Sequence, residues 1–567
     1  GAALFMVLFL AACFLLLHIF RRKDQALAHT VTLMVTTIII GYSLFTITVI
    51  RSSAGTPTNE YQPDNPYSLI RYLGREQYGS NPIVYGQMYT SPYEVEEKPY
   101  YTPLDGKYYQ ALNIDATYPA GTKMLFPRMW NGFDDRYKDF YKTYVTKTSP
   151  RRASLYGRNV TFQMPSMKDN LRFFFDYQVN YMYVRYFMWN FVGRQNDLHG
   201  QVPGDLVCGN WESGIGLIDR ARLGDQSDAP DWIAHNRGKN HYFFLPLILG
   251  LIGFFFQLRH DPRNSWVTGL LFLLTGLAIV VYLNQPPFQV RERDYAYAGS
   301  FYVFTIWIGL GVLALQNWFE SLTGKKDGMP AAALAVALGL VVPVLMGCQN
   351  WDDHDRSNRF TSVEMAKNYL NSVGPNGILV THGDNDTFPL WYAQEVENVR
   401  TDVRIVNTSL LGTDWHIDQM KYAVNESAPL PLTVPLSQYL YGTNEYISVY
   451  DRNNSVVPLA DVMRIFKHPD ARVTLTDGSK VDYIMSHKFS VPVNKENVIK
   501  YGILPERFTS QIPDEIVLTI PKDYITKQEL FFMDLLSNYQ WDRPINLLNQ
   551  GGDIEMGIKD YLMFEGY

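Results

Sequence analysis

The sequence predicts an α-helical multi-pass membrane bundle with large extracytoplasmic loops and a C-terminal α/β domain. The first observation behind this prediction is a set of six apolar runs, each close to the ~20 residues that cross a bilayer as a helix. The runs cover residues 2–20, 30–50, 242–258, 265–284, 301–319 and 330–347. A soluble protein with buried helices is the competing interpretation, and runs without charged side chains, such as 243–256 and 266–283, argue against it.

The second observation is that every other connector between these runs is short and basic. These connectors hold Arg21, Arg22 and Lys23, then Arg259, His260 and Arg263, then Lys325 and Lys326. Short basic connectors stay in the cytoplasm. The segments 51–240 and 285–300 and the tail from Gln349 are therefore expected outside, so both large polar regions fall on one side of the membrane.

The third observation is an alternation of strands and helices in the tail. We expect strands at 377–381 and 403–410, with the loop His382–Thr387 and a helix at 389–397 between them, which is the order of a βαβ unit. The remaining expected elements are a helix at 414–423, a hairpin at 473–481 with Asp477-Gly478 as its turn, a strand at 515–520 and a helix at 527–536.

Four regions follow from these observations. Residues 1–50 hold two transmembrane helices, 51–240 an outer loop region, 241–348 four transmembrane helices, and 349–567 an outer α/β domain. Within 51–240 we expect loops and short helices, with a short helix and loop at 211–225. The aromatic stretch 171–194 is too polar to span a bilayer comfortably, and an interfacial or partly buried helix fits it better.

Composition and cysteines narrow the function classes. The 567-residue chain has a net charge of −6, which gives no sign of a nucleic-acid partner. Cys208 and Cys348 both fall on the expected outer side, where topology permits a disulfide, whereas Cys13 lies in the first run. Gly1 opens almost directly into an apolar run, so we expect the chain to be the later part of a longer protein.

The first candidate site is the outer loop that ends in Arg291-Glu292-Arg293-Asp294-Tyr295. Two interpretations are open for its charged residues. They can form a salt-bridged clamp between the loop and the tail, or the two arginines can hold a lipid phosphate through bidentate hydrogen bonds.

The second candidate site follows the strand at 377–381. Asp384 and Asp386 stand two residues apart and could share a divalent metal ion, while His382 and Asn385 are candidates for substrate binding. Polar residues at the carboxyl end of such a strand lie where α/β sheets bind ligands. The alternative is structural, because Asp386 or Thr387 could instead be the N-cap of the next helix.

Two further segments allow a functional and a structural interpretation. The segment 189–197, with Arg194, Asn196 and Asp197, suits a sugar or lipid-phosphate pocket or an interfacial anchor. The segment 351–356 could bind a cation or form a charged collar where the chain leaves the membrane. The sequence holds no Walker-type phosphate loop, HExxH, paired CxxC or GxSxG motif. Energy-coupled pumps and the familiar hydrolases are therefore disfavoured as functions.

Four strings in the chain resemble a known family. They are QPPFQVRERDYAYAGSFY (285–302), NWDDHDRSNR (350–359), THGDNDTFPLWYAQEVENVRTDVRIVN (381–407) and RYFMWNFVGRQND (185–197). The family consists of multi-pass envelope proteins of gram-negative bacteria, formerly of unknown function. It is similar to C-type glycosyltransferases, which use polyprenyl-phosphate sugars, and to protein O-mannosyltransferases.

The resemblance implies a membrane glycosyltransferase-like protein in the bacterial inner membrane, with its loops and C-terminal domain in the periplasm. It would move a sugar or glycan from a polyprenyl-phosphate carrier to a protein or glycan acceptor, with a divalent metal as a further expected cofactor. In such folds the catalytic acid lies in the first outer loop, so we expect it upstream of Gly1 and assign no catalytic residue.

Two rival functions come from other classes. The alternative that stays open is a non-catalytic envelope scaffold, or a partner-docking subunit of a membrane protein complex. A transporter is disfavoured because the apolar runs carry almost no ionisable residues, and such residues mark transport pathways.

Overall fold

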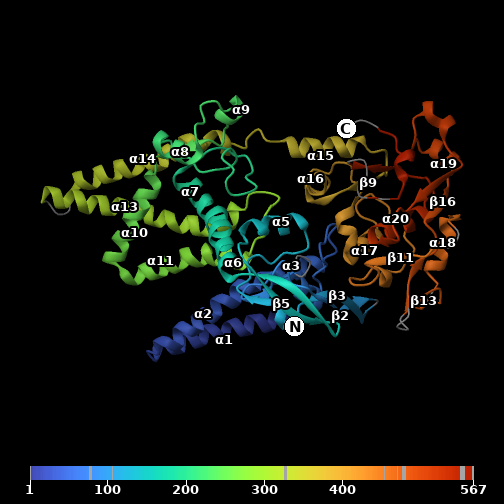
Figure 1. Cartoon of the computed structure of the whole chain (residues 1–567), viewed down its shortest axis with the longest axis horizontal. Coiled ribbons are helices and arrows are strands. Elements are labelled where there is room, and N and C mark those ends of the chain that lie inside the picture. Colours follow the sequence, from blue (N-terminus) through green and yellow to red (C-terminus); the bar gives the residue numbers. More distant parts are fainter. Residues whose placement is uncertain are drawn as a thin grey trace. The chain divides into compact units, whose positions relative to one another are not determined.

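The computed structural model describes residues 2–75, 79–104, 106–324, 328–451, 454–468, 470–474, 480–548, 554 and 556–564. The chain divides into two compact units. The central unit comprises Ser80–Glu96 and Ala116–Asn358, and the terminal unit comprises Gly1–Gly79, Glu97–Asp115 and Arg359–Tyr567. Figure 1 labels the elements of both units.

The apolar half of the central unit is a set of long helices. They are α10 (Leu245–His260), α11 (Pro262–Thr275), α12 (Leu277–Leu283), α13 (Ala298–Thr323) and α14 (Met329–His354). Helices α10 and α13 approach closely because Gly253 and Gly311 have no side chain; a Cβ on either glycine would collide with a backbone carbonyl of the other helix. Buried Gln257 on α10 accepts hydrogen bonds from Trp307 Nε1 (2.8 Å) and Thr268 Oγ1 (2.9 Å), which ties α10 to α13 and α11.

Within the described residues, four helical segments are long and apolar enough to cross a membrane. They are Ala26–Ser52, Pro262–Leu283, Asp294–Thr323 and Met329–His354. Two more predicted runs form helices, α1 (Ala2–Arg22) and the 16-residue α10, but neither is among these four. The apolar helices indicate a membrane-embedded protein, and a total of six spans stays a prediction. Lys325 and Lys326 lie outside the described residues.

The polar half of the central unit contains strands where loops and short helices were expected. Its strands are β1 (Tyr85–Gln87), β4 (Lys123–Leu125), β5 (Thr148–Leu155), β6 (Arg158–Pro165), β7 (Gly193–Arg194) and β8 (Asn240–His241). β5 and β6 form a regular antiparallel hairpin. Strands β2 (Glu94–Leu104) and β3 (Lys107–Thr117) also pair, and most of this pair, Glu97–Asp115, belongs to the terminal unit. The expectation of loops was therefore wrong here, because hairpins with short connections satisfy their backbone hydrogen bonds locally.

The aromatic stretch near 171–194 forms a helix in three segments. They are α6 (Met167–Phe173), a π-helical segment (Phe174–Val184) and α7 (Arg185–Phe191). The other short helices of this half are α5 (Asp135–Tyr144), α8 (Gly216–Leu223) and α9 (Asp231–Ala234), with 3-10 turns at Ala120–Thr122 and Asp294–Tyr297. Tyr177, Tyr186 and Phe173 are fully buried, so this helix is the core of the polar half.

The terminal unit begins with helices α1, α2 (Ala26–Ser43), α3 (Phe45–Ser52) and α4 (Pro66–Gly74). Among the described residues, its C-terminal part holds three three-stranded sheets and one two-stranded hairpin. The strands β10 (Arg404–Asn407), β9 (Ile378–Thr381) and β19 (Ile545–Leu547) form a parallel sheet in that order. Since α16 (Gly383–Glu395) connects β9 to β10, the predicted βαβ unit is present. Every residue of β9 and β10 is buried, as is typical of parallel strands.

The other two sheets each have three strands. They contain β15 (Tyr483–Ile484), β11 (Tyr446–Val449) and β18 (Tyr524–Thr526), and β12 (Val456–Pro458), β16 (Lys488–Pro492) and β17 (Glu515–Thr519). β13 (Val473–Thr474) pairs with β14 (Lys480–Val481) as the predicted hairpin, and its predicted turn, Asp477-Gly478, lies outside the described residues.

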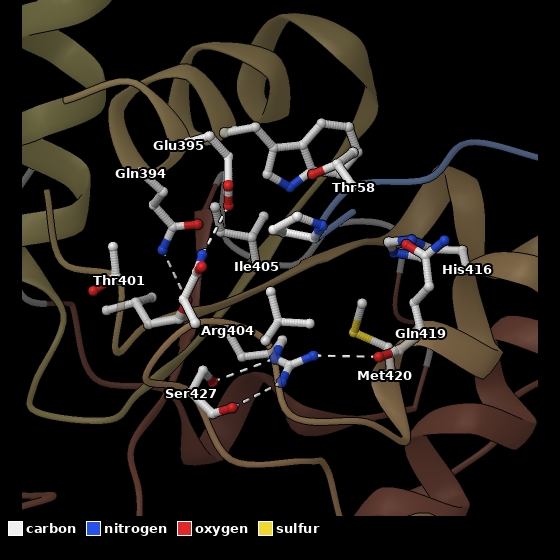
Figure 2. Close-up of a pocket in the computed structure, with 15 residues that line it drawn as sticks. Thr58, Gln394, Glu395, Thr401, Arg404, Ile405, His416, Gln419, Met420 and Ser427 are labelled. Carbon is white, nitrogen blue, oxygen red and sulfur yellow. Dashed lines mark hydrogen bonds between the residues drawn. The ribbon is translucent and has the colours of Figure 1, made fainter. Parts of the chain in front are cut away.

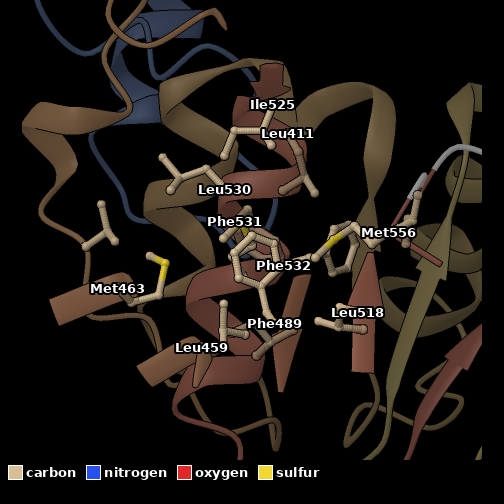
Figure 3. Close-up of a cluster of buried hydrophobic side chains, with 14 of the residues drawn as sticks. Leu411, Leu459, Met463, Phe489, Leu518, Ile525, Leu530, Phe531, Phe532 and Met556 are labelled. Atoms are coloured by element: carbon tan, nitrogen blue, oxygen red, sulfur yellow. The ribbon is translucent and has the colours of Figure 1, made fainter. Parts of the chain in front are cut away.

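The remaining helices of this part include α20, which carries its main core. They are α15 (Thr361–Ser372), α17 (Asp414–Met420), α18 (Leu459–Phe466), α19 (Lys495–Lys500) and α20 (Lys527–Ser537), with 3-10 turns at Thr408–Gly412, Leu436–Gln438, Glu506–Gln511 and Ile558–Tyr561. Helix α20 begins with a capping box of Thr526 and Glu529. Its Leu530 and Phe531 are fully buried against side chains from the surrounding strands, such as Phe489 and Leu518 (Figure 3).

Candidate functional site

A buried ion pair fixes the predicted loop at 285–295 within the central unit. Glu292 accepts two hydrogen bonds from the guanidinium of Arg185 on α7, at 2.7 Å and 3.1 Å. It also accepts from Tyr186 Oη (2.6 Å) and from the backbone N–H of Gly200 (2.9 Å). The two charged side chains are only 6% and 13% exposed, so this carboxylate is saturated by protein groups.

Aromatic rings and a carbonyl complete the surroundings of Arg185. Its guanidinium carbon lies 4.0 Å, 4.7 Å and 4.8 Å from the ring centroids of Tyr181, Tyr186 and Trp189. It also donates to the carbonyl of Gly209 (2.8 Å). Gly209 has φ +58°, and a Cβ there would press on the Leu198 carbonyl, so glycine is what lets the backbone reach the pair.

The electrostatics of Glu292 show that the pair is stable despite its burial. Burial by itself would raise the pKa of Glu292. The hydrogen bonds and charge of Arg185, together with the donors Tyr186 and Gly200, outweigh burial and hold that pKa below its usual value. Glu292 is therefore ionised at neutral pH, and it serves as an anchor rather than as a proton donor.

Glu292 thus belongs to a clamp, but its partner lies on α7 and not in the tail. The arginines on either side have no carboxylate partner among the described residues. Arg291 is exposed and makes no hydrogen bond or ion pair with them. Arg293 donates to two neutral groups, Gln289 Oε1 (3.2 Å) and Tyr295 Oη (2.6 Å). The loop therefore holds one neutralised acid, Glu292, a second acid, Asp294, and two arginines without a carboxylate partner among the described residues.

Arg194 is a third arginine that forms no ion pair with a carboxylate among the described residues. It stacks 4.0 Å from the ring centroid of Trp189, and its Nε is buried without a hydrogen-bond partner among the described residues. Burial lowers the pKa of Arg194. The nearby charges of Asp294 and Glu292 partly offset this effect.

The two residues that follow Arg194 along the predicted segment have structural roles. Asn196 is fully buried, donates to the carbonyl of Val207 (2.7 Å) and accepts from the N–H of Gly209 (2.9 Å). Asp197 exchanges two hydrogen bonds with Asn236 (2.8 Å and 3.2 Å). Both residues shape the turn beneath Arg185.

The second predicted site lies in the terminal unit at the carboxyl ends of β9 and β10. His382 Nδ1 lies 2.9 Å from Thr408 Oγ1 and 3.3 Å from Ser409 Oγ, which belong to the segment after β10. The two parallel strands therefore bring these polar residues to one edge, as expected.

Helix α16 begins earlier than expected. It starts at Gly383, whose φ of +73° suits glycine, and His382 is its N-cap residue. The predicted loop at 382–387 and the predicted N-cap at Asp386 or Thr387 were therefore wrong. The helix was expected to begin at Pro389, and proline is typical of first helical turns, but Pro389 lies in the second turn of this helix. Asp384 and Asp386 occupy its first turn, where the helix dipole favours negative charge.

These carboxylates do not form part of a complete metal-ligand set. Within the part of the chain that the structure describes, no three His, Cys, Asp or Glu side chains converge on one point. Asp384 and Asn385 are exposed, and Asp384 raises the pKa of Glu60, for which burial is the larger cause. A divalent ion here would need water for most of its ligands, and we derive no chemical step through it.

The structure also contains a small polar cavity that the sequence did not indicate (Figure 2). It has a volume of about 40 Å³ and is lined by side chains that include Arg404, His416, Gln419 and Ser427. Burial and the charge of Arg404 lower the pKa of His416 to about 3, so this imidazole is neutral. Arg404 donates to carbonyls near the end of α17, which satisfies its charge locally. This space suits a few water molecules.

The disulfide that topology permits between Cys208 and Cys348 is not formed in the structure. Cys13, Cys208 and Cys348 are all free thiols. The residues that sequence reasoning did not assign to the site are Arg185 and Tyr186. Their signal was present in the aromatic stretch 171–194, where arginines interrupt an otherwise buried face.

Fold and site together define a membrane-embedded helical protein with an α/β region and an arginine-rich loop. Residues 362–567 match the family model TMEM260-associated domain 2. Residues 79–175 match the Family of unknown function (DUF8416). No curated protein and no solved structure matches the chain. The matches are consistent with a membrane protein family of unknown function, and they give no support to a similarity with C-type glycosyltransferases.

Proposed function

We propose that the protein is glycosyltransferase-like and moves a sugar or glycan from a polyprenyl-phosphate carrier to a protein or glycan acceptor on the periplasmic face of the inner membrane. The observation that carries this proposal is the division of charge in the loop at 285–295. Its buried acid, Glu292, is neutralised by Arg185, whereas Arg291 and Arg293 have no carboxylate partner among the described residues.

The guanidinium chemistry of Arg291 and Arg293 favours a phosphate ligand. Guanidinium groups bind phosphate oxygens through paired N–H donors, and such charge-assisted hydrogen bonds are stronger than neutral ones. Half-buried Arg194 makes no ion pair among the described residues, although the charges of Asp294 and Glu292 partly stabilise it, and a bound phosphate would further offset the cost of its burial.

The place of the loop favours a phosphate carried by a lipid. The span Asp294–Thr323 begins inside the loop, so Arg291 and Arg293 stand just before a membrane-spanning helix. Lipid headgroups lie at this level of a bilayer. A polyprenyl phosphate presents its phosphate there while its chain stays in the hydrocarbon layer.

Lipid binding tests the proposal directly. We would reconstitute the full chain with undecaprenyl phosphate in lipid nanodiscs and measure the bound fraction by native mass spectrometry. Changing both Arg291 and Arg293 to Ala should weaken binding about tenfold or more, because each charge-assisted hydrogen bond contributes about 1.5–3 kcal/mol. The matched control changes Arg151 and Arg152, two exposed arginines on the β5–β6 hairpin, to Ala.

Equal binding by the wild type, the loop variant and the hairpin variant would contradict the phosphate site. A wild type that binds no polyprenyl phosphate, but co-purifies with a stable protein partner, would instead support the envelope scaffold.

The periplasmic placement needs a test of its own. We would build a variant without its native cysteines and place single cysteines at Ser227 in the expected outer region and at Asn264 in the expected inner connector, both exposed. A membrane-impermeant thiol reagent on intact spheroplasts should label position 227 and spare position 264. The opposite pattern would invert the proposed orientation.

The second predicted site keeps a place in this proposal as an acceptor site. His382, Asp384, Asn385 and Asp386 present a ring nitrogen, an amide and two carboxylates at the carboxyl edge of the parallel sheet. Such groups can hold the hydroxyl of an acceptor through hydrogen bonds.

A further inference from the structure

A hollow of about 350 Å³ lies between two helices of the central unit, away from the arginines discussed above. One wall is α5, and the other is the helix formed by α6 and the π-helical segment. The lining residues are Phe140, Thr143, Tyr144, Arg172, Asp176, Asn180 and Pro203. This volume falls at the lower end of the range for small-molecule sites, which is about 300–1,000 Å³.

The α5 wall is aromatic and rigid. Phe140 and Tyr144 stand four residues apart on one face of α5, with ring centroids 5.6 Å apart. The ring of Tyr144 packs edge-on against buried Phe173 (5.3 Å), and the ring of Phe140 packs against Tyr177 (5.6 Å). These contacts hold both rings in place. Tyr144 is only 9% exposed and the Arg172 guanidinium carbon lies 5.7 Å from its ring centroid, so half-buried Phe140 is the ring of this wall that is more open to an apolar ligand face.

The opposite wall is a row of polar side chains. Arg172, Asp176 and Asn180 follow one another at intervals of four residues along the helix, and all three are exposed. The π-helical geometry that carries the last two is rare in proteins and frequent at functional sites. The side-chain amide of Asn180 makes no hydrogen bond with the described residues.

The charges in this row cancel. Arg172 Nε lies 3.5 Å from Asp176 Oδ2, and both side chains are more than half exposed. An ion pair this loose and exposed contributes little to stability. It leaves several donors and acceptors available to a ligand without favouring an anion or a cation.

We propose that this hollow binds a neutral pyranose unit. One face of a pyranose ring consists of C–H groups that pack on aromatic rings, and its hydroxyls both donate and accept hydrogen bonds. The aromatic wall and the mixed polar row match these two properties. A phosphate would require net positive charge, and a purely apolar ligand would leave Asn180 without a hydrogen-bond partner and cover the exposed Arg172–Asp176 pair without offering it hydrogen bonds.

The hollow adjoins the arginine loop through one residue. Phe140, which lines the hollow, packs on Phe288 of that loop with ring centroids 5.4 Å apart. The inference therefore deepens the proposed function and rests on it for its biological meaning: the loop holds the phosphate and the hollow holds a sugar. The sugar could belong to the lipid-linked donor or to a glycan acceptor.

Binding of simple glycosides to the full chain in detergent tests the inference. The probes are the methyl pyranosides of glucose, galactose, mannose and N-acetylglucosamine, observed by saturation-transfer difference NMR. At least one should bind, and Asp176→Ala should weaken it about tenfold or more, since hydrogen bonds to a charged group are lost. The control is Asp139→Ala, which removes an exposed, lysine-paired carboxylate from α5 outside the hollow.

The results separate this inference from the proposed function. Wild type that binds none of the four glycosides, or an Asp176→Ala variant that binds as well as the control, would overturn the sugar site. Glycoside binding should survive in the Arg291→Ala, Arg293→Ala double variant. A wild type that binds glycosides but no undecaprenyl phosphate would leave the sugar site standing while the proposed function fails.

Competition identifies the source of the sugar. Displacement of the glycoside by a polyprenyl-phosphate-linked sugar, but not by a free oligosaccharide, assigns the hollow to the donor. The reverse pattern assigns it to the acceptor, and both patterns support a sugar site.

Discussion

The two predicted sites each carry two acidic residues, but the structure places Glu292 of the first and Asp384 of the second in opposite environments. In the loop at 285–295, Glu292 is buried and shares four hydrogen bonds with Arg185, Tyr186 and Gly200. In the terminal unit, Asp384 is exposed in the first turn of α16. The first acid organises the backbone around it and leaves cations unpaired, whereas the second stays in water. Burial, rather than the charge pattern, separates an anchor from a surface group.

The largest effect should come from removing the anchor. Glu292→Ala leaves the buried guanidinium of Arg185 without its partner, and such changes cost about 3–5 kcal/mol of folding free energy. The melting temperature of the detergent-solubilised chain should therefore fall strongly. A variant that melts like wild type would show that Glu292 does not anchor the loop.

Acid should weaken the same anchor in the wild type. The pKa of Glu292 is depressed in the folded state, so its contribution is complete above the unfolded value of about 4.5 and is lost as pH falls through the folded pKa. The melting temperatures of wild type and Glu292→Gln should differ at pH 7 and converge as the pH falls from about 4.5 through the depressed pKa of Glu292. A difference that does not change with pH would exclude ionisation of Glu292 as the cause.

A smaller effect is expected beneath the second site. Buried Thr387 donates to the carbonyl of Gly383 (2.8 Å), and its hydroxyl lies 2.7 Å from that of Thr381. Thr387→Val removes these hydrogen bonds and should cost about 1–3 kcal/mol in chemical unfolding. Thr387→Ser keeps the hydroxyl and is the matched control. A Thr387→Val variant as stable as wild type, or a loss seen only in Thr387→Ser, would show that the methyl group and not the hydroxyl matters here.

The smallest effect is expected at the exposed acid. Asp384→Asn weakens an interaction with the helix dipole but also relieves repulsion of Glu60, so stability should change by no more than about 0.5 kcal/mol. The same variant tests the predicted divalent ion. Mn²⁺ that raises the melting temperature of wild type but not of Asp384→Asn would support an ion there, and unchanged curves would count against it.

The elements that the sequence predicted well are those with a strong local pattern. β9, β10 and α20 lie close to their expected residues because continuous apolar strands and a helix with a capping box are local signals. The hairpins at 94–117 and 148–165 were missed. The dipeptides Asp105-Gly106 and Tyr156-Gly157, each between runs rich in β-forming residues, were the available signal.

The site was predictable only in part. The charged loop and the aromatic stretch were both recognised, but their contact joins Arg185 to a residue 107 positions away. Spacing along the chain cannot reveal such a pairing. The π-helical segment was also beyond local reasoning, because α and π turns place apolar residues at similar intervals, and only packing decides between them.

The most direct test of the central claim is an experimental density map of the full chain with undecaprenyl phosphate bound in a lipid nanodisc. We expect the phosphate within hydrogen-bond distance of the guanidinium groups of Arg291 or Arg293, with Glu292 still paired to Arg185. Density for the phosphate at any other surface, with both arginines facing solvent, would contradict it.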